Sequence, residues 1–197
     1  GGDKDIIGSV IGSWMAGDGR DNILTAAGGV NLMSAGAGNA VLLGGPGNDL
    51  LFGGGGDTLL IAGTGNTLMI GGAGRSRLIG GPGNDMLFAG NGTSAKLLDG
   101  GGGENLLFGG DGADTFVIAG TLDVVRNFTR GQDLLDVSRL GVADIGGLVL
   151  AGDESGGVII DAAGTLRALV VGTDVRTLTA SDFLFAAPAA TTTLALA

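Results

Sequence analysis

Small, polar and apolar residues recur with a period of nine along most of the chain. From Ala35 to Phe88 the sequence divides into six consecutive blocks, AGAGNAVLL, GGPGNDLLF, GGGGDTLLI, AGTGNTLMI, GGAGRSRLI and GGPGNDMLF. Each block begins with a glycine-rich stretch and ends with a short apolar run. Self-similarity at a fixed period is the sequence signature of a repeat architecture. The pattern therefore predicts a stack of equivalent units.

Related blocks flank this run on both sides. Two precede it, with Ser34 between them and the run as a one-residue insertion, and an eleven-residue block and two further nonapeptides follow it. These flanking blocks lie at residues 16–24, 25–33, 89–99, 100–108 and 109–117. The repeat region predicted from the sequence is therefore 16–117.

The composition of a block predicts its local structure. Glycine occupies positions two and four almost throughout, and glycine adopts positive φ without strain, so the first six positions are expected to form a tight turn. The last three positions are expected to form a strand whose middle side chain, at position eight, points inward. These inward residues are Ile23, Leu32, Leu42, Leu51, Leu60, Met69, Leu78, Leu87, Leu107 and Phe116. Two blocks per coil, stacked, bury this column and predict an all-β parallel β-roll.

Charge and missing residue types narrow the chemistry. The chain has 10 Lys and Arg against 20 Asp and Glu, a net charge of −10, which disfavours nucleic acid as a partner and favours divalent cations. It contains neither His nor Cys, so Ser-His-Asp and Cys-His catalysis and thiolate metal sites are excluded. HExxH and GxSxG motifs are missing as well. We therefore expect this chain to be non-catalytic.

Two blocks carry a family resemblance. Gly44–Phe52, GGPGNDLLF, and Gly80–Phe88, GGPGNDMLF, match the GGxGxDxUx pattern of the RTX nonapeptide repeat. The chain thus resembles the C-terminal β-roll domain of type I secreted proteins, as in serralysin. The resemblance implies a parallel β-roll with a C-terminal antiparallel β capping unit, Ca²⁺ as the bound cofactor, a type I exporter as partner, and a secreted, extracellular or cell-surface location in bacteria.

The same resemblance implies where calcium lies. In the family the ion sits between turns on one edge of the roll, held by backbone carbonyls and by the aspartate at position six. One edge then carries Asp49, Thr67, Asp85 and Asn105 at position six, and the other carries Ala40, Thr58, Ser76, Ser94 and Asp114. Since no two of these aspartates are neighbours on one edge, we expect fewer sites than in a regular roll. The alternative for the central coils is that Thr, Asn and Ser hydrogen bonds hold them without metal.

Several acidic residues are candidate ligands. Asp49 and Asp85 are the best candidates because their blocks fit the motif at every diagnostic position. Asp57, Asp99 and Asp111 are offered as replacements in the irregular blocks. Two further candidates are Asp114, at position six of the other edge, and Asp21, in an earlier, well-formed block.

Positions seven and nine should point outward and make one face of the roll apolar. On the sheet that follows the first edge these positions hold Leu50, Phe52, Leu68, Ile70, Met86, Phe88, Leu106 and Phe108. An exposed apolar patch of this size marks an interaction surface. We expect it to pack against another chain or a neighbouring domain of the parent protein, and the alternative is that the C-terminal segment of the chain itself covers it.

The remaining segments are assigned by contrast with the repeats. Residues 1–15 are an N-terminal lead-in or cap, and residues 118–187, which predict hairpins, form the C-terminal capping region that a solenoid needs. Residues 188–197 are small and of low complexity, which predicts a flexible tail and a candidate secretion signal.

Three hypotheses for function follow. The first is a calcium-binding module that folds outside the cell and supports type I secretion of its parent protein. The second is a self-associating adhesin or surface-layer segment, which the apolar face favours. The third is the tail of a secreted hydrolase or epimerase whose catalytic domain lies outside this sequence.

Overall fold

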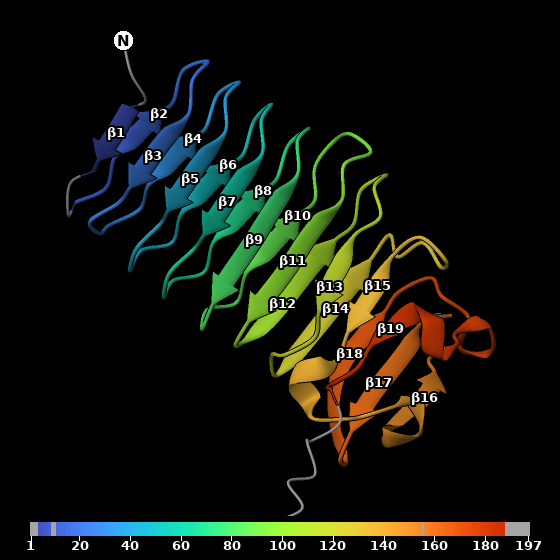
Figure 1. Cartoon of the computed structure of the whole chain (residues 1–197). Helices are drawn as coiled ribbons and strands as arrows, with labels where there is room; N and C mark the ends of the chain where they lie inside the picture. Colours follow the sequence, from blue (N-terminus) through green and yellow to red (C-terminus); the bar gives the residue numbers. More distant parts are fainter. Residues whose placement is uncertain (1–3, 9–10, 155, 188–197) are drawn as a thin grey trace, which may run out of the picture.

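A computed structural model describes residues 4–8, 11–154 and 156–187 of the chain, and Figure 1 shows the strands of these residues stacked into a flattened coil with a compact unit at its C-terminal end. The strands form two sheets, of nine and ten strands within the described residues. Sheet A contains β1 (Lys4–Ile7), β3 (Asn22–Thr25), β5 (Ala40–Leu43), β7 (Thr58–Ile61), β9 (Ser76–Gly81), β11 (Lys96–Gly101), β13 (Thr115–Val117), β15 (Leu134–Asp136) and β19 (Phe183–Leu184). Sheet B contains β2 (Trp14–Ala16), β4 (Leu32–Ser34), β6 (Leu50–Phe52), β8 (Leu68–Ile70), β10 (Met86–Phe88), β12 (Glu104–Phe108), β14 (Leu122–Arg126), β18 (Thr165–Val170), β17 (Val158–Ala162) and β16 (Leu148–Gly152).

The chain alternates between the two sheets, so that every coil contributes one strand to each. Neighbouring strands of the roll are parallel, for example Leu51 of β6 opposite Met69 of β8. The predicted parallel β-roll is confirmed. We call the turns from sheet A into sheet B the first edge and the turns from sheet B into sheet A the second edge. The first edge includes residues 26–31, 44–49, 62–67, 80–85 and 100–105, and the second includes 17–22, 35–40, 53–58, 71–76, 89–96 and 109–114.

Glycine permits both the shape of a turn and the closeness of successive turns. Gly45, at position two, has φ of 86°, a conformation that side chains rarely adopt. Gly47, at position four, has ordinary φ, but a Cβ there would collide with the carbonyl oxygen of Gly29 in the preceding coil. Position two is therefore set by backbone conformation and position four by the stacking distance.

The core is a single column of position-eight side chains between the two sheets. From Leu42 through Leu107 these side chains have no exposed surface. The column contains Met15, Leu24, Met33, Leu42, Leu51, Leu60, Met69, Leu78, Leu87, Leu98, Leu107, Phe116, Val125 and Leu135. Because each rung covers the next, burial of this column is the main apolar contribution to the fold.

The repeat frame differs from the prediction at its N-terminal end. Asn22 lies opposite Ala40, and Leu32 lies opposite Leu50, so residues 17–34 follow the strict nine-residue period without an insertion at Ser34. Ile23 and Leu32, predicted to be inward, are 45% and 39% exposed, and their successors Leu24 and Met33 fill the core instead. The prediction was wrong by one residue there because both blocks offer two adjacent apolar residues.

The long block at residues 89–99 also differs. Lys96, not Ser94, lies opposite Ser76, so the two extra residues are in the turn before Lys96. Lys96 therefore occupies position six, Leu98 enters the core and Asp99 takes position nine.

The roll extends beyond the predicted limits at both ends. β1 and β2, within the segment predicted as a lead-in, pair in parallel with β3 and β4 as ordinary rungs. β14 and β15, within the segment predicted as the cap, pair in parallel with β12 and β13. Parallel coiling thus continues from residue 4 to residue 136.

The C-terminal unit completes both sheets. β16, β17 and β18 form an antiparallel meander, as predicted, and β18 joins the roll by pairing in parallel with β14. In the described residues, four short 3-10 helices lie in the segments between β15 and β16 and between β18 and β19. They are Ser138–Leu140, Ile145–Gly147, Val175–Thr177 and Ala180–Asp182. The described part of the chain includes no helix long and apolar enough to cross a membrane. Residues 188–197, the predicted tail, lie outside the described residues.

The outer face of sheet B is apolar, as the alternation predicts. Trp14, Leu50 and Met86 are 78%, 38% and 42% exposed, and the Phe88 and Phe108 rings stack with their centroids 4.4 Å apart. In Figure 1 the C-terminal unit lies at the end of the roll and not over this face. The described residues of the cap therefore leave the face open.

Candidate metal centre

A column of buried polar side chains runs along the first edge at position six. Asp49 and Asp85 are each 1% exposed. Asp49 Oδ1 accepts hydrogen bonds from Asn31 N, at 2.8 Å, and Asn31 Nδ2, at 2.7 Å. Asp85 Oδ1 accepts one from Thr67 N at 2.7 Å. From Asp49 onward, each position-six side chain thus ties its own turn to the turn before it. The column consists of Asn31, Asp49, Thr67, Asp85, Asn105 and Asp123.

A second ladder runs along the same edge at position five, in the opposite direction. Asn48 Oδ1 accepts from Asn66 N, and Asn66 Oδ1 accepts from Asn84 N, both at 2.8 Å. Asn84 Oδ1 in turn accepts from Glu104 N at 2.9 Å. The two ladders hold consecutive turns in register from both directions, so the oxygens inside the edge have fixed positions.

Asp49 and Asp85 each keep one carboxylate oxygen without a partner. Their Oδ2 atoms are buried and accept no hydrogen bond. Because a buried carboxylate oxygen without a partner is costly, these two atoms suit contact with a cation.

Each free oxygen lies in a small space above the glycine at position one of its turn. A Cβ built on Gly44 would meet Asp49 Oδ2 at 2.6 Å and also the carbonyl oxygen of Ala62 in the next coil. A Cβ built on Gly80 would likewise collide with Asp85 Oδ2 and the carbonyl oxygen of Gly100. Both spaces are therefore lined by one carboxylate oxygen and one carbonyl oxygen from successive coils. Oxygen donors of these two kinds are those that calcium prefers, so the residues fit this ion.

Burial makes the ionised form of these carboxylates unfavourable when no cation is present. It raises the pKa of Asp85 from 3.8 to about 6, although the hydrogen bond from Thr67 N acts in the opposite direction. Burial raises the pKa of Asp49 as well, against the lowering effect of its two hydrogen bonds from Asn31. A bound cation would favour the ionised form at both positions.

Comparison with known proteins agrees with this geometry. The family model for the RTX calcium-binding nonapeptide repeat matches residues 14–42, 25–60, 34–67, 61–94 and 97–117, which together make up more than half of the chain. This chain belongs to the RTX calcium-binding repeat family. Its repeats are accordingly calcium-binding repeats, and the roll that they build is a calcium-binding structural module.

Three solved structures are similar to this RTX roll. The AlgE6R2 subunit of the Azotobacter vinelandii mannuronan C5-epimerase is 25% identical with a TM-score of 0.47, over 63% of this chain and 90% of that one. The AlgE6R3 subunit of the same enzyme is 28% identical with a TM-score of 0.34, over 72% and 83%. Extracellular lipase LipA from Serratia marcescens is 14% identical with a TM-score of 0.43, over 84% of this chain but only 40% of the lipase. No curated protein matches the chain.

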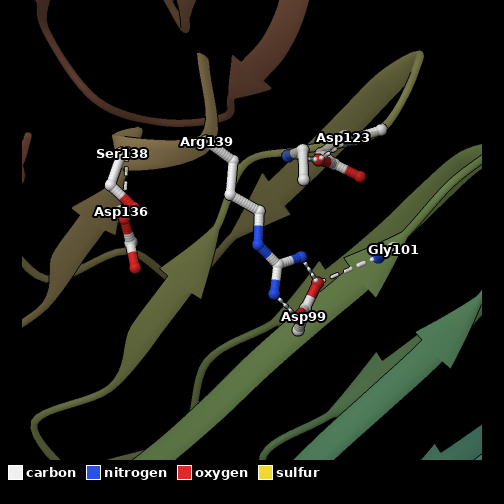
Figure 2. Close-up of polar contacts among 8 residues, drawn as sticks. Asp99, Gly101, Asp123, Asp136, Ser138 and Arg139 are labelled. Atoms are coloured by element: carbon white, nitrogen blue, oxygen red, sulfur yellow. Dashed lines mark hydrogen bonds and ion pairs between the residues drawn. The ribbon is translucent and has the colours of Figure 1, made fainter. Parts of the chain in front are cut away.

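Of the other predicted ligands, Asp99 is engaged by the cap of the RTX roll. Figure 2 shows the Arg139 guanidinium directed at its carboxylate, with Nη1 2.9 Å from Oδ1 and Nη2 2.7 Å from Oδ2. Asp99 Oδ1 also accepts from Gly101 N at 3.1 Å. Asp99 is 2% exposed, and both oxygens of its carboxylate bind the arginine. Asp99 therefore joins the cap to the roll and is not among the calcium ligands that we propose.

Asp114 does occupy position six, but its oxygens are already used. Oδ1 accepts from Lys96 N at 2.9 Å and Oδ2 from Gly110 N at 2.8 Å. Asp21 and Asp57 lie at position five of the second edge, where each Oδ1 accepts a backbone N–H of the next coil. Asp111 is an exposed residue within its turn. None of these four has an unpartnered buried oxygen like those of Asp49 and Asp85.

Sequence reasoning missed two position-six aspartates, Asp123 and Asp133. Asp123 lies opposite Asn105, eighteen residues earlier, and accepts from Asn105 Nδ2 at 2.9 Å. Asp133 Oδ1 accepts from Asp114 N at 2.8 Å, so Asp114 and Asp133 are neighbours on the second edge, contrary to the expectation that no such pair exists. Burial raises the pKa of both missed residues. The eighteen-residue spacing from Asn105 was the available signal.

Proposed function

We propose that this chain is a calcium-responsive folding module, with Asp49 and Asp85 as the carboxylate ligands of two calcium sites on the first edge. The observation that supports it is the pair of buried, unpartnered Oδ2 atoms, each beside a carbonyl oxygen of the next coil. When bound, calcium supplies the positive charge that makes ionised carboxylates acceptable in these positions.

The residues of each site position the oxygen atoms that would bind calcium. Asp49 Oδ1 and Asp85 Oδ1 orient their carboxylates by accepting N–H bonds from the preceding turn, so each Oδ2 is directed toward its glycine. Gly44 and Gly80 leave the space that a side chain would fill. Ala62 and Gly100 bring carbonyl oxygens from the following turn. Each site therefore includes oxygens of two coils, and its occupation favours the stacked state over the unfolded chain.

This coupling supports a role in secretion. Calcium sites of extracellular modules have dissociation constants of about 10⁻⁴ to 10⁻³ M, well above cytosolic calcium levels. The chain would therefore remain unfolded in a bacterial cell, pass through a type I exporter, and fold in the calcium outside. Export of a longer parent protein, such as a secreted hydrolase or epimerase, is the setting in which such a module would act.

Calcium titration of chelated protein, followed by circular dichroism, tests the coupling. We expect β-structure signal to rise with calcium up to the millimolar range and to reverse with chelator. Metal analysis of the same samples should give two ions fewer for the double variant Asp49→Asn/Asp85→Asn than for the wild type. A β signal that is the same with and without calcium would contradict the proposal.

The apolar face of sheet B favours a second candidate function, self-association of an adhesin or surface-layer segment. Leu50 and Met86 remain 38% and 42% exposed in the centre of this face. The experiment is size-exclusion chromatography in calcium of Leu50→Lys/Leu68→Lys/Leu106→Lys, with Val149→Lys on the exposed part of the cap as control. A smaller apparent size for the triple variant alone would support self-association, and an unchanged size would exclude it.

A further inference from the structure

Lys96 occupies a position at which the other coils carry small polar, acidic or alanine side chains. It lies opposite Ser76 in the pairing of β11 with β9, which places it in the position-six column of the second edge. Its backbone N–H donates to Asp114 Oδ1 at 2.9 Å, the same contact that Thr67 N makes with Asp85 Oδ1 on the first edge. The two extra residues of the turn before it thus deliver a lysine to a column where the repeat pattern has an aspartate.

This lysine is enclosed by the turn. Only 4% of its surface is exposed, and its ammonium donates to the carbonyl oxygen of Ser94 at 2.8 Å. Lysine is almost never buried to this extent unless it is paired with opposite charge. Burial lowers its pKa, whereas the carboxylates of Asp114 and Asp57 act to raise it and favour the ammonium form. The positive charge is therefore placed within an acidic stretch of the edge.

The space beside position one that we propose for calcium on the first edge has no counterpart in the coil of Lys96. Position one is Ala89, which is 1% exposed, where the two first-edge sites have Gly44 and Gly80. The neighbouring Asp114 has both carboxylate oxygens occupied by N–H donors. The coil therefore has a buried cation of its own, a methyl group in place of the glycine hydrogen, and a neighbouring carboxylate whose two oxygens already have partners.

We propose that Lys96 is a tethered cation that replaces a metal ion on the second edge and offsets the carboxylates of Asp114 and Asp57. The two edges of the roll then differ in chemistry. The first edge receives its positive charge from calcium, and the C-terminal part of the second edge carries its own. This positive charge is present at any calcium concentration.

Urea unfolding in chelator, with sucrose to bring the transition into range, tests the lysine directly. Lys96→Met keeps the length and apolar stem of the side chain and removes the charge. Arg77→Met is the control, since Arg77 is exposed on the adjacent strand β9 and its loss changes the net charge by the same amount. We expect a lower urea midpoint for Lys96→Met than for Arg77→Met. Equal midpoints, or a higher one for Lys96→Met, would overturn the proposal, because Met preserves packing but not charge.

Metal analysis tests the second part of the proposal, that the C-terminal part of the second edge binds no metal ion. Asp114→Asn should bind as many ions as the wild type, since both oxygens of this carboxylate already accept N–H bonds, whereas Asp85→Asn should lose one. Loss of an ion in Asp114→Asn would refute the inference. The predicted difference in calcium binding between the two edges rests on the proposed function, whereas the comparison of Lys96→Met with Arg77→Met in chelator does not. If the wild-type protein bound no calcium, the proposed function would be wrong, and the unfolding experiment would still test the role of Lys96.

Discussion

Replacing Asp85 by Asn should change stability in opposite directions with and without calcium. Asn keeps the shape of the side chain and an oxygen that can accept from Thr67 N, and it removes the charge. Without calcium the wild type contains a buried carboxylate whose pKa is raised to about 6 from 3.8. That difference corresponds to at most roughly 3 kcal/mol of folding free energy. Because water at the edge screens the charge in part, we expect the variant to gain about 1–2 kcal/mol in chelator at pH 7.5.

The pH dependence follows from the raised pKa. The folded state binds a proton more tightly than the unfolded state, so the unfavourable contribution of Asp85 is fully present above about pH 6. It declines between pH 6 and 3.8 and disappears below, where both states are protonated. The advantage of the variant in chelator should therefore vanish as the pH falls through this window.

In calcium the sign reverses. A ligand at about 100 times its dissociation constant stabilises the folded state by roughly 2.7 kcal/mol, and the variant loses that contribution at one site. The assay is urea unfolding by circular dichroism, in chelator with sucrose to bring the transition into range and in excess calcium, with metal analysis alongside. Asp57→Asn, on the exposed position-five ladder, is the control. A variant that is less stable than wild type in chelator, or that binds as many ions, would refute the reasoning.

Three further substitutions test the core, the calcium space and the cap. Leu87→Ala empties a fully buried rung and should lower the unfolding free energy in calcium by about 2–5 kcal/mol, with a smaller loss indicating collapse of the cavity. Gly80→Ala places a methyl group against the Asp85 site and should remove one ion in metal analysis, whereas Gly19→Ala, with nothing within 4 Å of its Cβ, should not. Arg139→Ala leaves buried Asp99 without its cation and should destabilise the protein by about 1–3 kcal/mol in urea unfolding, and an unaffected midpoint would show that the pair is dispensable.

Local sequence determined the architecture of this protein. A turn that needs glycine at position two for its positive φ and at position four for the close approach of the next coil repeats every nine residues, as does an inward apolar residue. Both requirements act within one block or between adjacent coils, so the nine-residue spacing of the sequence is enough to predict them. The same spacing placed Asp49 and Asp85, which we propose as calcium ligands, at position six of blocks that satisfy every position of the motif.

Tertiary structure decided the points at which the local pattern is degenerate. Ile23 and Leu24 are both apolar, so only pairing with β5 shows which of them faces the core. The turns before Asp123 and Asp133 contain fewer glycines, and Asn127 adopts a φ of 58° in place of a glycine. The periodic signal fades there although the coil continues.

The nine-residue pattern also could not predict contacts between residues that are distant in sequence. Asp99 meets Arg139 forty residues later, through a cap whose docking no nine-residue rule describes. Lys96 reached position six because the extra residues were taken up by the turn and not by the strand. The sequence by itself determined that the chain coils and where a regular turn can hold calcium. Only the stacked coils decided which carboxylates keep a free oxygen, because that depends on the N–H groups and cations that adjacent coils and the cap bring to them.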